Sequence, residues 1–235
     1  IKAKSFFKGI YTIPPGKFYE INENFGIKIK DYWKPKKIKM LGNKDYKKQV
    51  LKLKNIYKQL VMERTQADFP VACLLSGGID SSSIACNISS KKNNQIHYFS
   101  AFTEDKNYDE SKMIKKIVKH KKLKHSFIKV KRDNKKNLQI IDNVIRKTGN
   151  LVPTVSWLLY CYICEAIKKR KFKVVLTGTG GDEIFAGYYA HHLHFLQFLK
   201  NNESKTIFQK NYYNWRKLIT PFIRNKKLKD FDYYT

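Results

Sequence analysis

The chain has 235 residues, 42% of them hydrophobic, and a formal net charge of +29. This length is enough to bury one full core and part of a second, and no apolar run reaches the ~18 residues that a membrane span needs. There is no secretory signal, and the four cysteines lack regular spacing, which favours reduced thiols in the cytoplasm. We therefore expect a cytoplasmic protein with one main domain and no membrane partner.

The positive charge comes from 48 basic residues, and most of them are Lys spread over nearly every predicted helix. Scattered Lys is typical of a solvated surface rather than of a binding stripe, so nucleic acid is not the expected partner. RNA binding stays the alternative, and its salt dependence would reveal it. Because residue 1 is Ile and not Met, we expect a fragment of a longer protein.

The first part of the chain, residues 1–35, alternates apolar and polar residues over short runs. Turn residues at 14–16 and 22–26 separate these runs, a pattern that predicts antiparallel strands. The expected strands cover 9–13, 17–21 and 27–33. Pro35 and the Lys-rich stretch after it indicate a boundary, and a helical apolar period over 45–66 follows.

From residue 71 onward, strand patterns alternate with helix patterns. The expected strands are 71–75, 96–101, 125–130 and 172–177, and the expected helices are 81–90, 109–121, 134–147, 155–169 and 183–199. This alternation predicts an α/β fold with a doubly wound parallel sheet, similar to a Rossmann fold. Ligands of such sheets bind beyond the carboxyl ends of the strands, where strand order reverses. The tail from Asn201 has no clear assignment.

The segment 71–83, VACLLSGGIDSSS, places an apolar strand before a Ser-Gly-Gly turn and a helix start. Glycines let the backbone approach a ligand closely, and helix N–H groups with the Ser81 and Ser82 hydroxyls can face an anion. Asp80 would repel a phosphate unless a divalent cation lay between them, and Mg²⁺ takes such oxygen ligands. The Gly-Lys-Ser/Thr ending of kinase-type loops is missing. A glycine turn that serves packing alone is the plainer alternative.

The segment 173–188, KVVLTGTGGDEIFAGY, repeats this arrangement after a second strand. Asp182 follows the glycines, in position to share a metal with Asp80. The two carboxylates would repel each other without Mg²⁺, which could also stabilise charge on a departing pyrophosphate. For Glu183, interaction with the helix dipole in the first turn is the favoured interpretation over a ligand role.

The pair SGGIDSS and TGTGGDEIFAGY resembles the synthetase domain of glutamine-hydrolysing asparagine synthetases, which have the adenine nucleotide α-hydrolase fold. The Pro-Pro-Gly strand pair near the start is similar to the end of that family's glutaminase domain. The resemblance implies the end of a glutaminase domain at 1–35, an ATP-binding synthetase domain at 45–200 and a truncated helical extension at 201–235. It also implies a cytoplasmic enzyme, and the chain could form a homodimer.

The resemblance further implies that ATP adenylates a carboxylate, aspartate in the type reaction, and that ammonia derived from glutamine attacks the acyl-AMP. Adenylation converts a poor leaving group into a better one. The implied pyrophosphate residues are Ser76, Gly77, Gly78, Asp80 and Ser81, with Leu74, Ala101, Thr177 and Gly178 around the nucleoside. Asp80 and Asp182 are the implied Mg²⁺ ligands, and Thr179 and Asp182 occupy the catalytic positions.

Thr179 departs from the pattern of the family, which usually has Glu in this loop. A threonine hydroxyl is not a base near neutral pH, so acceptors other than aspartate stay open. Two other functions also stay open: a tRNA-modifying enzyme with the same first loop, and a nucleotide-binding protein without catalysis. The four cysteines all lie within predicted synthetase elements, so this segment is expected to use ammonia and not glutamine.

Other polar clusters have plainer interpretations. We expect His191, His192 and His194 to be packed or solvated rather than zinc ligands, and Cys161 and Cys164 to pack in a core. Tyr108, Asp109 and Glu110 suit a helix cap better than a substrate contact. Tyr212, Tyr213, Trp215 and Arg216 could stack on bases, but ordinary packing is the preferred interpretation.

Overall fold

The structure is a computed structural model, and it describes residues 3–36, 45–88, 95–104, 109–130, 133–152, 154 and 156–234. The chain divides into two compact units. One unit contains residues 1–66, 101–109 and 127–172, and the other contains 67–100, 110–126 and 173–235. The second unit contains both glycine-rich loops, and we call it the loop unit.

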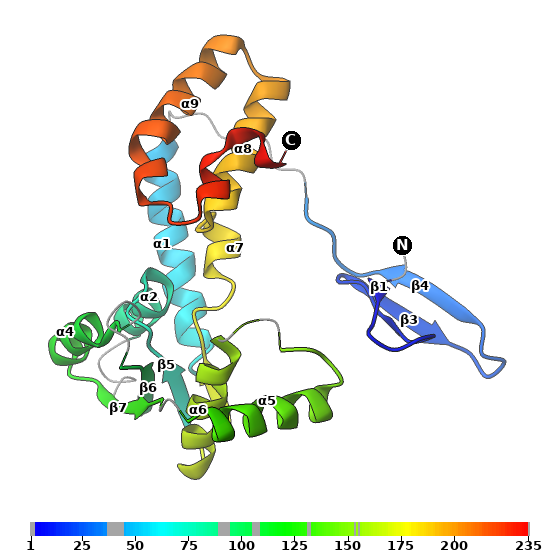
Figure 1. Cartoon of the computed structure of the whole chain (residues 1–235), viewed down its shortest axis with the longest axis vertical. Helices are drawn as coiled ribbons and strands as arrows, with labels where there is room; N and C mark the ends of the chain where they lie inside the picture. Colours follow the sequence, from blue (N-terminus) through cyan, green and yellow to red (C-terminus); the bar gives the residue numbers. More distant parts are fainter. Residues whose placement is uncertain are drawn as a thin grey trace. The chain divides into compact units, whose positions relative to one another are not determined.

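The amino-terminal strands form two antiparallel pairs, β1 (Ala3–Lys4) with β2 (Tyr11–Thr12) and β3 (Lys17–Ile21) with β4 (Ile27–Asp31) (Figure 1). The predicted strand 17–21 is confirmed, whereas 9–13 and 27–33 were predicted too long. Gly16 before β3 has φ +75°, a value that glycine adopts without strain, and its carbonyl accepts the N–H groups of Tyr32 and Trp33 at 2.9 and 3.2 Å. These two bonds join the residue before β3 to the residues after β4, and so hold together the ends of the hairpin opposite its turn.

The central sheet has the strand order β7-β6-β5-β8. Its strands are β5 (Val71–Leu74), β6 (Ile96–Phe102), β7 (Lys124–Lys129) and β8 (Val174–Leu176). β5 pairs in parallel with β6 on one side and with β8 on the other. Along the chain, β6 and β7 are added on one side of β5, and β8 is then added on the other side of β5. The strand order therefore reverses between β5 and β8. The predicted α/β sheet is confirmed, and both glycine-rich loops follow the two strands at its reversal point.

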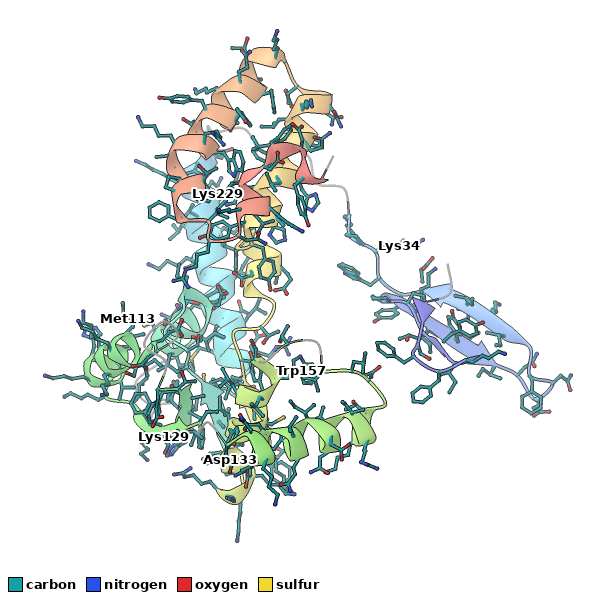
Figure 2. All side chains as sticks on the ribbon, viewed as in Figure 1. Lys34, Met113, Lys129, Asp133, Trp157 and Lys229 are labelled. Carbon is teal, nitrogen blue, oxygen red and sulfur yellow. The ribbon has the colours of Figure 1, made fainter. Side chains whose placement is uncertain are left out.

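Most predicted helices are found within a few residues of their expected ends. They are α1 (Tyr46–Glu63), α2 (Ile79–Asn87), α4 (Ser111–Lys121), α5 (Asn134–Thr148) and α6 (Ser156–Lys169). The last two positions of the predicted helix 81–90 lie outside the described residues. Local chemistry sets some of these ends: the Asp133 carboxylate, labelled in Figure 2, accepts the Lys136 N–H at 3.0 Å where α5 begins.

One helix prediction was wrong, and the tail that the residue pattern left unassigned is helical. The expected helix 183–199 is two helices, α7 (Gly181–Phe185) and α8 (Tyr189–Asn202), because Ala186 adopts φ +56° between them and ends α7. The unassigned tail forms α9 (Lys205–Leu218) and three short 3₁₀ helices, η2 (Thr220–Phe222), η3 (Lys226–Lys229) and η4 (Phe231–Tyr234). Ser204 caps α9 by accepting the Ile207 N–H at 3.4 Å.

The core of the loop unit surrounds β5 and β6. Ala72, Cys73, Tyr98 and Phe99 have no exposed surface. Burial raises the pKa of the Cys73 thiol to about 12, so this cysteine stays protonated and unreactive. All four cysteines are free thiols. Among the described residues, no helix is long and apolar enough to cross a membrane.

His125 on β7 makes the stability of the loop unit depend on pH. Ser100 Oγ donates to the Leu75 carbonyl, so its oxygen accepts a bond from His125 Nε2 at 2.8 Å, and burial lowers the pKa of His125 to about 4. The unfolded chain takes up this proton near pH 6.5. The stabilising contribution is therefore complete above about pH 6.5 and is lost as the pH falls toward the folded value.

We expect the midpoint of thermal unfolding to fall between about pH 7.5 and about pH 5, and to fall less in His125→Asn. Calorimetry at both pH values measures this difference. The matched control is His120→Asn, because His120 is exposed on α4 and its replacement should leave the wild-type pH dependence unchanged. Equal pH dependence in His125→Asn and the wild type would contradict the assignment.

Candidate active site

The first loop begins at a firmly anchored strand end. Leu75 is 1% exposed, and its N–H donates to the Phe99 carbonyl of β6 at 2.9 Å. The Ser100 hydroxyl donates to the Leu75 carbonyl. Because both backbone groups of Leu75 are paired with β6, the residues that follow leave the sheet from a fixed point.

Within this loop, Ser81 stabilises the turn itself. Its hydroxyl oxygen accepts the Ser76 N–H at 3.1 Å and lies 2.9 Å from Ser76 Oγ, and Ser81 is only 5% exposed. In the structure the loop therefore uses the Ser81 hydroxyl for an internal hydrogen bond. Ser82 Oγ is buried and has no hydrogen-bond partner among the described residues.

Gly77 brings the loop against the first turn of α4. It has φ +81°, and a Cβ there would lie 3.3 Å from Ile114 Cγ1 and 3.5 Å from the Cβ atoms of Glu110 and Met113. Met113 is labelled on α4 in Figure 2. Glu110 occupies the N-cap position of α4, as expected, but its side chain makes no cap hydrogen bond. Desolvation raises the pKa of its carboxyl.

The two glycine-rich loops touch each other. A Cβ at Gly178 would lie 2.9 Å from the Ser81 nitrogen and 3.1 Å from Asp80 Cβ. At Gly181 a Cβ would lie 2.7 Å from both carboxylate oxygens of Asp80. At Gly178 the close atom is backbone, so a larger residue would push the loops apart, whereas at Gly181 a larger residue would displace the Asp80 side chain. Asp80 therefore lies directly against the residue that precedes Asp182.

Asp182 is held from the other side by Gly187. The Asp182 carbonyl accepts the Gly187 N–H at 2.9 Å, and a Cβ at Gly187 would collide with Asp182 Oδ1. The turn at Ala186 that separates α7 from α8 produces this contact. The break between the two helices thus sets the position of the Asp182 carboxylate.

Tyr188 ends the second motif, but no role at the site was predicted for it from the sequence. Its hydroxyl donates to Glu183 Oε1 at 3.0 Å, and this bond, followed by the charges of Glu183, Asp182 and Asp80, raises the pKa of Tyr188. Both aspartates therefore act electrostatically on one phenol. Its place as the last residue of the motif TGTGGDEIFAGY was the signal that the sequence offered. Glu183 lies in the first turn of α7, as expected.

We expect the pKa of Tyr188 to fall toward the ordinary value in Glu183→Gln, because the accepting carboxylate and its charge are both removed. Nuclear magnetic resonance of tyrosines labelled at Cζ measures this pKa directly. Tyr213→Phe is the control variant, because Tyr213 is an exposed tyrosine on α9. An unchanged Tyr188 titration in Glu183→Gln would refute the pairing.

The remaining predicted site residues lie near the same strand ends. Thr177 and Thr179 follow β8, and the Thr179 N–H donates to Thr177 Oγ1 at 3.3 Å, while the Thr179 side chain is exposed. Leu74 ends β5, and Gly78 is the N-cap residue of α2 with no side-chain cap. Ala101 packs against a cluster of Val130, Leu158 and Tyr162, outside the loop unit.

The plainer interpretations of the other polar clusters mostly hold. Trp215 is 4% exposed and packs with Tyr212, so neither is free to stack on bases, whereas Tyr213 is exposed. His191 and His192 are half-buried and His194 is exposed. Cys161 is half-buried on α6, but Cys164 is exposed, so core packing was wrong for Cys164. Tyr108 lies outside the described residues.

The donors at the site suit a cation that also binds phosphate. In the described part of the chain, no three His, Cys, Asp or Glu side chains are grouped as a complete metal site. Mg²⁺ does not need one, because it binds through one or two carboxylates and takes its other ligands from water and substrate phosphates. Asp80 and Asp182 therefore fit a magnesium ion that is bound together with a nucleotide.

Comparison with known proteins identifies the family. Residues 52–232 match the family model of asparagine synthase. Amidase chyE of Penicillium rubens is 29% identical over 207 residues, which cover 81% of this chain and 30% of that protein. The putative glutamine-hydrolysing asparagine synthetase 2 of Methanocaldococcus jannaschii is 29% identical over 171 residues, 68% of this chain and 30% of that protein.

Among solved structures, the NH3-dependent NAD synthetase from Campylobacter jejuni aligns over 73% of this chain and 89% of its own, with a TM-score of 0.40 and 16% identity. The chain spans about a third of the length of the two curated relatives, with 30% coverage of each. The family model, in contrast, covers most of the chain and includes both loops. The chain belongs to the asparagine synthase family.

Proposed function

We propose that this chain is the ATP-dependent, amide-forming synthetase part of its enzyme. The observation that carries the proposal is the contact of the Asp80 carboxylate with Gly181, next to Asp182, at the reversal point of the sheet. Relatives named asparagine synthetase support a ligase of this kind. The acceptor is a carboxylate, and aspartate is the first to be tested.

The charge around the two loops explains why a cation is needed. Residues 65–90 and 174–199 contain no Lys or Arg, although 48 of the 235 residues are basic. The charged groups of the loops are Asp80, Asp182 and Glu183, so a triphosphate would be repelled. A magnesium ion held by Asp80 and Asp182 would supply the positive charge that binds the phosphates and stabilises the leaving pyrophosphate.

The chain's own groups have defined tasks in this proposal. The uncapped first turn of α2 and the backbone of Gly77 and Gly78 present N–H groups to the pyrophosphate. Ser76 and Ser81 fix the shape of the turn that would hold the pyrophosphate. Leu74, Thr177 and Gly178 lie beside the nucleoside, and Thr179 lines the acceptor side of the second loop.

The proposed reaction has two steps. A carboxylate oxygen attacks the α-phosphorus of ATP, the bond to the bridging oxygen breaks, and pyrophosphate leaves. Ammonia then attacks the acyl carbon, the bond to the AMP oxygen breaks, and the amide, AMP and a proton are released. Thr179 stands where the family usually has Glu, and no described side chain of the two loops is placed to act as a general base in its stead. Positioning of the reactants would therefore account for a larger part of the rate enhancement.

The proposed domain organisation follows the family. Residues 1–35 would be the end of a glutaminase domain, 45–200 the synthetase domain and 201–235 the start of a helical extension. Cys73 is buried with a raised pKa, which makes it unsuited to hydrolyse glutamine, so we propose that this chain uses ammonia. Its free thiols favour a cytoplasmic location.

The test is exchange of labelled pyrophosphate into ATP, which reports adenylation alone. With Mg²⁺ and a suitable carboxylate we expect exchange, and with added ammonia we expect AMP and an amide as products. Mass spectrometry identifies both. ADP as the nucleotide product, or no exchange with any acid, would reject the proposed function.

A further inference from the structure

The peptide bond between Leu75 and Ser76, at the start of the first loop, is held from both sides. The Leu75 carbonyl accepts the Ser100 hydroxyl of β6. The Ser76 N–H donates to Ser81 Oγ of α2 at 3.1 Å. This carbonyl and this N–H belong to one planar group, so the two bonds together fix the orientation of that plane. The direction in which the loop leaves the sheet therefore depends on Ser100 as well as on Ser81.

Ser100 is itself held by His125 of the neighbouring strand β7. Ser100 is 1% exposed, and its oxygen lies 2.8 Å from His125 Nε2. Because the Ser100 hydroxyl gives its only proton to the Leu75 carbonyl, its oxygen is the acceptor and the imidazole carries a proton on Nε2. Hydrogen bonds that are linked in this way strengthen one another where water is excluded. A chain of hydrogen bonds thus runs from β7 through β6 to the residue after β5 (Figure 1).

A second serine–histidine pair joins the same two strands on the opposite face of the sheet. His97 Nε2 of β6 lies 2.8 Å from Ser126 Oγ of β7. Side chains alternate between the faces of a strand, so positions 97 and 100 of β6 lie on opposite faces, as do positions 125 and 126 of β7. The two pairs have the same length, but the one that contains Ser100 continues to the Leu75 carbonyl. The molecule therefore contains its own comparison for the effect of such a pair on the loop.

We infer that Ser100 and His125 are positioning residues for the pyrophosphate part of the nucleotide. They act through the peptide plane between Leu75 and Ser76 and not by contact with the ligand. The inference rests on the proposed function and adds two residues, from strands outside both motifs, to the groups that serve it. Without their bonds the plane can rotate, the Ser76 N–H leaves Ser81 Oγ, and the N–H groups of the loop no longer converge on one anion.

The experiment measures, in the full chain, calorimetric binding of a nonhydrolysable ATP analogue with Mg²⁺ and of AMP, which lacks the pyrophosphate. Pyrophosphate exchange gives the KM values. Ser100→Ala removes the bond to the Leu75 carbonyl, and His125→Leu removes the donor to Ser100. His125→Gln keeps a side-chain N–H donor and is the conservative variant. Ser126→Ala is the matched control, because it removes a serine–histidine bond of the same 2.8 Å between the same strands.

We expect Ser100→Ala and His125→Leu each to weaken binding of the ATP analogue, and to raise the KM for pyrophosphate, by about tenfold. The Kd for AMP and the KM for the carboxylate should stay at the wild-type values, and His125→Gln should retain most of the affinity. The double variant should bind about as weakly as Ser100→Ala alone, because both residues act through one chain. Thermal unfolding measures the cost in stability, which Ser126→Ala should share. If Ser100→Ala does not fold, His125→Leu decides the test, because position 125 is only half-buried.

Wild-type affinity of Ser100→Ala or His125→Leu for the ATP analogue would overturn this inference. A Ser126→Ala variant that binds as weakly as Ser100→Ala would overturn it too, and so would an equal loss of affinity for AMP, because either result indicates general destabilisation of the sheet. Absence of exchange with every acid would reject the proposed function, while the binding measurements would still decide the inference. A wild type that binds neither ligand would overturn both.

Discussion

Replacing Asp80 or Asp182 with Asn is expected to lower Mg²⁺-dependent pyrophosphate exchange by about 10²-fold or more, with the protein still folded. Each carboxylate supplies half of the protein's ligands to the proposed cation, and the segments around the loops contain no Lys or Arg that could replace it. Exchange rates at saturating Mg²⁺ and ATP, together with circular dichroism, test this expectation.

The matched control is Glu203→Gln, which removes one negative charge from an exposed position after α8 in the same unit. It should exchange at the wild-type rate. If Asp182→Asn retained normal exchange while Asp80→Asn did not, Asp182 would have no part in cation binding. The two-carboxylate site would then be wrong.

Gly181→Ala is expected to weaken Mg²⁺·ATP binding by at least about tenfold without lowering thermal stability. The new Cβ would occupy space within 2.7 Å of both Asp80 carboxylate oxygens and would displace that side chain. Alanine favours helix over glycine by about 1 kcal/mol, so α7 itself gains. Gly178→Ala should be more damaging, because its Cβ meets the Ser81 backbone nitrogen at 2.9 Å and pushes the loops apart, at a cost of about 1–3 kcal/mol.

Gly180→Ala separates these effects. Gly180 has φ +96°, and a Cβ added there would meet no atom within 4 Å, so the change strains the backbone without touching Asp80. It should lower the unfolding temperature while keeping more nucleotide affinity than Gly181→Ala. The reverse ranking in calorimetric titrations would show that Asp80 is not held in place by contact with Gly181.

The parts of the fold with a clear pattern of apolar residues were predictable from the sequence. The apolar run at 71–75 and the mostly apolar segment at 96–101 identify buried strands, and glycine after each of two strands identifies the ligand edge. The contact of Asp80 with the second loop was also expected, because an acid after each of two neighbouring strands needs a common cation.

The remainder depends on tertiary context. The break between α7 and α8 depends on Ala186 in a left-handed conformation, which residues other than glycine rarely adopt and no local pattern indicates. The Ser81 hydroxyl looked available in the motif, but the fold uses it to hold Ser76. Tyr188 gains its raised pKa only because the loops bring three acids near it. The residue pattern alone did not indicate α9, because most of the residues on its buried face are aromatic.

The central claim is that Asp80 and Asp182 hold one cation together with the phosphates. The most direct test is calorimetric titration of Mn²⁺ with a nonhydrolysable ATP analogue into the wild type, Asp80→Asn, Asp182→Asn and the double variant. We predict one metal-nucleotide complex per chain, similar weakening by each single change, and a double variant far less affected than the sum of the two. Additive losses, or wild-type affinity in either single variant, would contradict the claim.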